Sequence, residues 1–163
     1  MRPLVRAIET LSDTAGYLAG ATVLGLTALI ASAVVARRIF GAPILAADEV
    51  SGYLMLAIVF FGLAHTMKAG GHIRVDIVLA HVPVTVRERL DALAILLALT
   101  FTLALLGGAW ALLAEYYRHG TTSFKSLQIP LWMPATLPVA GAALLALQLV
   151  AQFLRKLPGP PEP

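Results

Sequence analysis

The side chain with the clearest potential for chemistry is His65, which lies inside the uncharged stretch 50–67. Two histidines at similar depth on neighbouring helices could hold a haem iron. His72, His81 and His119 fall outside the uncharged stretches, so they supply no second ligand at that depth. We therefore interpret His65 as a neutral histidine near the membrane surface, hydrogen-bonded to the backbone, and expect no cofactor. A four-helix membrane cytochrome stays as an alternative hypothesis.

Carboxylates form two further groups that could bind a partner or an ion. Asp48 and Glu49 precede the same uncharged stretch, where a negative charge complements the positive end of a helix. We interpret them as capping residues, with a specific ion pair as the alternative. His72, Arg74 and Asp76 form a charge cluster, and exposed pairs of this kind contribute only about 0–1 kcal/mol. We expect no catalytic residue and no metal site, and the absence of cysteine excludes thiolate ligands.

The elements that carry these residues follow from the hydropathy of the chain. It has 163 residues, 59% hydrophobic and only 13% charged, which is too apolar for an ordinary soluble domain. Four long stretches carry no charge, and at about 1.5 Å per residue each covers most or all of a hydrocarbon core about 30 Å thick. Continuous apolar runs favour helices over barrel strands. The sequence predicts an all-α polytopic membrane protein with one four-helix domain, 1–156, whose spans lie at about 14–36, 50–68, 90–115 and 130–154.

The positions of Lys and Arg predict how the chain is oriented. The two termini and the middle loop together hold eight of these residues, against four on the opposite side, and short loops rich in Lys and Arg stay in the cytoplasm. Both termini are therefore predicted to be cytoplasmic and the loops 37–49 and 115–125 external. Arg37 and Arg38 are a local exception, for which only interfacial snorkelling offers an explanation. Because the basic residues lie at span ends, we exclude nucleic acid as a partner.

The middle loop and the C-terminus carry their own signals. The Gly70-Gly71 pair is predicted to end the second helix. The segment 73–82 is predicted to lie against the cytoplasmic membrane surface. Thr85 and Glu88 match a capping box, so the third helix is predicted to begin just after Thr85. The Pro-rich tail, 157–163, is predicted to be disordered.

Small residues and one proline predict details of helix packing. Gly16 and Gly20 form a G-x-x-x-G pair in the first span, and Gly107 and Gly108 lie in the third. Such positions allow close approach of two helices. The sequence leaves open whether the second helix belongs to this chain or to a partner. Pro138 lies inside the fourth span and is predicted to bend it, because proline lacks the N–H that the helix needs.

The spans also argue against one class of function. Substrate and ion pathways usually carry ionisable residues deep in the membrane, and the four uncharged stretches contain none. A self-sufficient transporter of ions or carboxylates is therefore disfavoured, although a stand-alone small transporter stays as an alternative hypothesis.

A set of short motifs in fixed order resembles a known family. The resemblance covers roughly residues 10–155 and is to the small membrane subunit (DctQ-like) of tripartite ATP-independent periplasmic (TRAP) transporters. The residues that carry it are Glu49, Phe61-Gly62, Gly71-His72-Ile73-x-Val75-Asp76, Ser126-x-x-Ile129-Pro130-x-Trp132, Pro138 and Gly141.

The resemblance implies a non-catalytic scaffold subunit in a bacterial or archaeal inner membrane. Its partners would be surrounding lipids, a large membrane subunit that couples transport to a sodium gradient, and a periplasmic binding protein that delivers substrate, often an organic acid. The loops 37–49 and 115–125 would face that binding protein. The candidate subunit-interface residues are Glu49, Gly62, His72, Asp76, Ser126, Pro130, Trp132 and Pro138.

Overall fold

The computed structural model describes residues 2–69, 83–124 and 127–156. These residues form four α-helices, each long and apolar enough to cross a membrane. The prediction of an all-α chain with four spanning helices is therefore confirmed. The helices are α1 (Arg2–Ile39), α2 (Ala47–Lys68), α4 (Val84–His119) and α5 (Trp132–Lys156).

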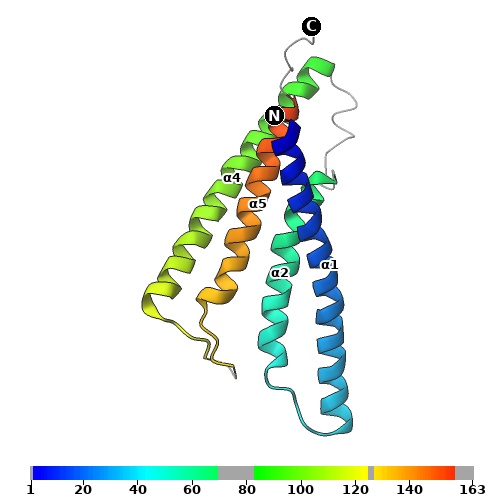
Figure 1. The fold of residues 1–163 in the computed structure, drawn as a ribbon, viewed down its shortest axis with the longest axis vertical. Coiled ribbons are helices and arrows are strands. Elements are labelled where there is room, and N and C mark those ends of the chain that lie inside the picture. The colour runs from blue at the N-terminus through cyan, green and yellow to red at the C-terminus, as the bar shows by residue number, and fades with distance from the viewer. Residues whose placement is uncertain (1, 70–82, 125–126, 157–163) are drawn as a thin grey trace.

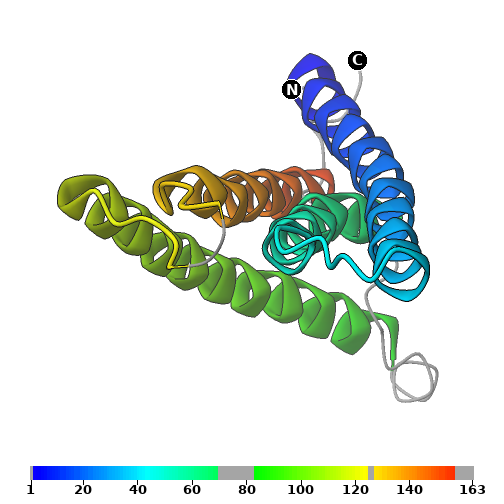
Figure 2. The same cartoon turned by 90° about the horizontal axis from the view of Figure 1, so that it is seen from below.

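The helices pack in the spatial order α1, α2, α5, α4. Helix α2 packs on α1 and on α5, α5 packs on α4, and α1 has a smaller contact with α5. Figure 2 shows α2 and α5 between the flanking helices α1 and α4. The connections 40–46 and 120–131 lie at one end, called here the loop end, and the first residues of α1 lie at the opposite, terminal end (Figure 1). The pair α4 and α5 diverges from α1 and α2 toward the loop end (Figure 1).

A buried apolar cluster joins α2, α4 and α5 in the half of the bundle nearer the terminal end. Met67, Ile95, Leu145 and Leu149 form the buried cluster there. Many large apolar side chains elsewhere face outward, above all on α1 and α4. Such a surface is stable against lipid tails, which are as apolar as leucine.

Two glycines allow helices to approach closely. A Cβ atom added at Gly141 of α5 would lie 2.5 Å from the carbonyl oxygen of Phe60 on α2. One added at Gly16 of α1 would lie 2.5 Å from Cγ of His65 on α2. Open space, with nothing within 4 Å of an added Cβ, surrounds the other candidates, Gly20, Gly62, Gly107 and Gly108.

Helix α4 begins slightly earlier than predicted and with a different first residue. Its N-cap is Pro83 rather than Thr85, and the N–H of Val86 donates to the Pro83 carbonyl at 3.0 Å. The prediction was wrong here because Pro83 already has extended backbone, with ψ near 149°, and so marks the boundary itself. The side chains of Thr85 and Glu88 lie outside the described residues.

The remaining boundary predictions fall largely beyond the described part of the chain. Helix α2 ends at Lys68, and Ala69, its C-cap residue, keeps right-handed backbone angles. The Gly70-Gly71 pair, the segment 73–82 and the tail 157–163 lie outside the described residues. Helix α5 continues through Pro138, and the bend expected there stays a prediction.

Candidate functional site

Glu49 is a buried carboxylate at the loop end. It lies in the first turn of α2 and is only 3% exposed. Its Oε1 accepts a hydrogen bond from the Tyr53 hydroxyl at 2.9 Å, and its Oε2 accepts one from the Leu127 N–H at 3.2 Å. A buried carboxylate needs such donors, because losing water without replacement is costly. Glu49 therefore ties α2 to the connection between α4 and α5.

This arrangement extends the capping interpretation of the acidic pair. Asp48 and Glu49 both occupy the first turn of α2, where negative charge complements the helix. The N-cap residue, Ala46, makes no side-chain cap hydrogen bond. The bond from Tyr53 stays within α2, but the bond from Leu127 reaches across to another helix connection, a tertiary role that the sequence did not reveal. No sequence signal points to Leu127, because it contributes only its backbone N–H.

Backbone hydrogen bonds order the described parts of the connection 120–131, residues 120–124 and 127–131. Gly120 ends α4 with left-handed backbone angles, which glycine adopts without strain. The N–H of Ser123 donates to the Ile129 carbonyl, and the N–H of Leu131 donates to the Thr121 carbonyl, both at 2.9 Å. The two arms of the connection are therefore held side by side.

Four residues give this connection and its two ends their outer shape. Gln128 has φ of 47°, an unusual value for a residue with a Cβ. The rings of Tyr117 and Trp132 pack edge to face with their centroids 6.1 Å apart. This contact links the end of α4 to the start of α5. Phe124 is 99% exposed. The connection thus presents one fully exposed aromatic ring on an ordered backbone.

The structure brings some motif residues together and leaves others apart. Glu49, Pro130 and Trp132 come from two distant parts of the sequence and lie at or next to the connection at the loop end. Gly62 lies farther along α2, and Pro138 lies within α5. His72, Asp76 and Ser126 lie outside the described residues.

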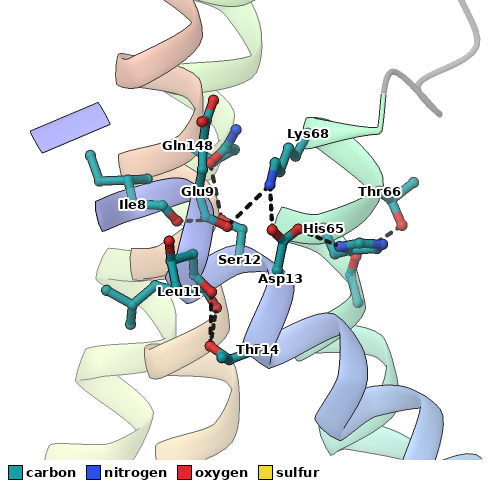
Figure 3. A network of polar contacts seen from close by, with 12 residues as sticks. Ile8, Glu9, Leu11, Ser12, Asp13, Thr14, His65, Thr66, Lys68 and Gln148 are labelled. Carbon is teal, nitrogen blue, oxygen red and sulfur yellow. Dashed lines mark hydrogen bonds and ion pairs between the residues drawn. The ribbon is translucent and has the colours of Figure 1, made fainter. Parts of the chain in front are cut away.

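A polar cluster at the terminal end joins α1 to α2 (Figure 3). Lys68 Nζ donates to Asp13 Oδ2 at 2.5 Å and lies 3.4 Å from the Glu9 carbonyl oxygen. His65 Nδ1 lies 3.4 Å from Asp13 Oδ1, within ion-pairing distance when the ring is protonated. The side chains of Asp13 and Lys68 are 38% and 27% exposed. The pair is therefore partly accessible and not sealed in the core.

Ser12 extends this cluster to α5. It is fully buried, and its Oγ lies 3.0 Å from both the Ile8 carbonyl oxygen and Gln148 Oε1. A hydroxyl has a single proton, so it donates to one of these acceptors at a time. Gln148 is itself only 5% exposed. Ser12 therefore joins α1 to α5, whereas Asp13 joins α1 to α2 (Figure 3).

Sequence reasoning missed this cluster, although a signal for it exists. Asp13 and Lys68 directly flank two uncharged stretches, and opposite charges at the same end of two spans favour a cross-helix pair. His65 faces Asp13 rather than only backbone. His119, at the opposite end of the bundle, has Nδ1 2.9 Å from the Glu115 carbonyl oxygen. Within the described residues, no group of three or more His, Cys, Asp or Glu could hold a metal ion.

A family comparison identifies the class of protein to which this arrangement belongs. Residues 26–159 match the model for tripartite ATP-independent periplasmic transporters, DctQ component. The chain belongs to the DctQ family. It is the small component of a TRAP transporter, a multi-pass membrane protein of a transporter family rather than an enzyme family. No curated protein sequence matches the chain.

The DctQ match covers the two ends of the bundle unequally. It includes Glu49 and the whole connection 120–131 at the loop end. At the terminal end it includes Lys68 and Gln148 but begins after Ser12 and Asp13. The loop-end contacts therefore fall entirely within the DctQ region, whereas half of the terminal-end cluster precedes it.

Proposed function

We propose that this DctQ subunit is the non-catalytic scaffold of a sodium-coupled TRAP transporter that takes up organic acids. A large membrane subunit moves the substrate, and a periplasmic binding protein delivers it. The subunit lies in a bacterial or archaeal inner membrane, with both termini in the cytoplasm and the loop end facing the periplasm. The eight-to-four distribution of Lys and Arg supports this orientation.

The observation that carries the proposal is the absence of charge in the middle of the spans. The stretches 14–36, 50–67, 92–114 and 126–154 hold no Asp, Glu, Lys or Arg, and an ion or carboxylate pathway usually needs such groups. The described charged contacts serve the subunit itself. Asp13 and Lys68 join α1 to α2, and Glu49 holds the connection 120–131.

The exposed glycines support a role in binding the large subunit. Gly20 on α1 and Gly107 and Gly108 on α4 have open space where a Cβ would lie. Small residues of this kind let a neighbouring helix approach closely in a membrane. We assign the large subunit to surfaces near Gly20 and Gly107, whereas Gly16 is used within the chain against His65.

The loop end is proposed to receive the binding protein. The loop 37–49 lies there, as does the described part of the loop 115–125, residues 115–124. Arg37 and Arg38 are exposed near the end of α1, and Phe124 is exposed in the connection 120–131. The motif residues Glu49, Pro130 and Trp132 would then act indirectly, by fixing the shape of this surface. His72, Asp76, Ser126, Gly62 and Pro138 remain candidate subunit-interface positions.

Reconstitution tests the proposal. Proteoliposomes are prepared with the large subunit and the binding protein, with or without this chain, and uptake of a labelled organic acid is measured with an inward sodium gradient. Uptake is expected only when all three proteins are present and should fall to background without sodium. Equal uptake in vesicles that lack this chain would contradict a scaffold role.

A matched pair of variants tests the proposed surface. Gly20→Leu should reduce the amount of large subunit that co-purifies with the chain, because the added side chain prevents close approach. Leu24→Met, on the same helix and also exposed, is the control, since this change nearly conserves volume. Equal recovery of the large subunit with both variants would remove Gly20 from the interface.

A further inference from the structure

An apolar groove of about 600 Å³ opens between α2, α4 and α5 in the loop-end half of the bundle. Helix α5 lies between α2 and α4 and packs on both, so it forms the floor of the groove. The walls include Phe60 of α2 and Leu112 of α4. None of the described residues that line the groove carries a charge.

The groove has a closed inner end. Phe60 lines it, and the backbone of Phe60 is also where Gly141 of α5 makes its close approach to α2. On α2 the lining residues run from Tyr53 to Phe60, seven positions or about 10 Å at about 1.5 Å per residue. On α4 they run from Tyr116 to Ala104, twelve positions or about 18 Å, and Ala104 is the midpoint of the candidate span Arg89–His119. The groove therefore ends near the middle of the membrane, about one leaflet deep in a hydrocarbon core about 30 Å thick.

This depth decides between the possible occupants. The groove lies within membrane-spanning helices, so hydrocarbon or a helix of another protein could cover it, whereas an apolar space does not hold water. A helix with its side chains is about 10–12 Å wide and must cross both leaflets. Beyond Phe60, the buried cluster that joins α2, α4 and α5 closes the groove halfway along the bundle. An acyl chain is narrow, occupies one leaflet and ends near the middle of the membrane.

We propose that the groove binds one acyl chain of a phospholipid from the leaflet at the loop end. The terminal methyl group lies near Phe60 and Gly141, and the glycerol end lies toward Tyr53 and Tyr116, because tyrosine favours the membrane interface. The Tyr53 hydroxyl donates to Glu49, which holds this side chain in the groove wall. The bound chain fills the space that opens where α2 diverges from α4 and α5.

Native mass spectrometry of the full chain, extracted from membranes in mild detergent, tests the proposal. The unsubstituted chain is expected to retain one phospholipid. Gly108 lines the groove and has open space at its Cβ position, so Gly108→Leu should fill the groove and lower retention about tenfold, equivalent to about 1.4 kcal/mol. Gly107→Leu is the matched control, because Gly107 is also open but is not among the lining residues.

The proposal is overturned if the unsubstituted chain retains no phospholipid. It is also overturned if Gly108→Leu leaves retention unchanged, or if both variants lower it equally. A photo-reactive amino acid at Leu112, placed in the complete transporter, distinguishes the occupants directly. An adduct with a phospholipid supports the acyl-chain site, and an adduct with the large subunit refutes it.

Discussion

Replacing Glu49 by alanine should release the connection 120–131 from α2. The carboxylate is 3% exposed and accepts hydrogen bonds from the Tyr53 hydroxyl and the Leu127 N–H. A hydrogen bond to a charged group contributes about 1.5–3 kcal/mol. Because Tyr53 lies on α2 itself, only the Leu127 bond joins the connection to α2, and its loss should cost the connection about 1.5–3 kcal/mol of local stability. Glu49→Gln keeps a carbonyl acceptor for one donor and should lose about half of this.

Hydrogen exchange of the peptide covering 121–131 measures this release. A loss of about 1.5–3 kcal/mol corresponds to exchange roughly 10- to 100-fold faster in Glu49→Ala than in the parent. Exchange in Glu49→Gln should be intermediate between the two. Asp48→Ala is the control, because Asp48 is exposed in the same turn of α2 and should leave the peptide unchanged. Parental exchange in Glu49→Ala, or equal acceleration in Asp48→Ala, would refute the reasoning.

Two further experiments test contacts between helices. Gly141→Ala places a Cβ 2.5 Å from the Phe60 carbonyl oxygen and should destabilise the chain by about 1–3 kcal/mol in thermal unfolding in detergent. Gly62→Ala, in open space, should be neutral or stabilising, and equal Tm losses would contradict the close contact. A double-mutant cycle of Asp13→Ala and Lys68→Ala should give a coupling of about 0–1 kcal/mol, because both side chains are partly exposed. A coupling above about 2 kcal/mol would argue against that degree of solvent access.

The four spanning helices could be predicted because charge marks their limits. The second span, predicted to end at residue 68, ends at Lys68 in α2. Helix α1 begins at Arg2, well before the predicted span, because Glu9 and Asp13 can continue a helix beyond the apolar stretch. Hydropathy locates the part of a helix that suits the membrane, but it does not locate where the helix ends in water.

The spatial order of the helices could not be predicted, because it depends on which face of each helix packs inward. Gly16 and Gly20 share one sequence pattern, yet Gly16 meets His65 and Gly20 faces open space. At the loop end, Glu49 was singled out, but its backbone partner at Leu127 has no sequence signature. Contacts to backbone depend on the path of the whole chain and not on residue type.

Binding of labelled sodium and of a labelled organic acid to the purified subunit, compared with the complete transporter, tests the central claim most directly. The account predicts saturable binding by the complete transporter and none by this chain alone, because its uncharged stretches carry no ionised side chain. Saturable binding of either ligand by the subunit alone would contradict a purely structural role.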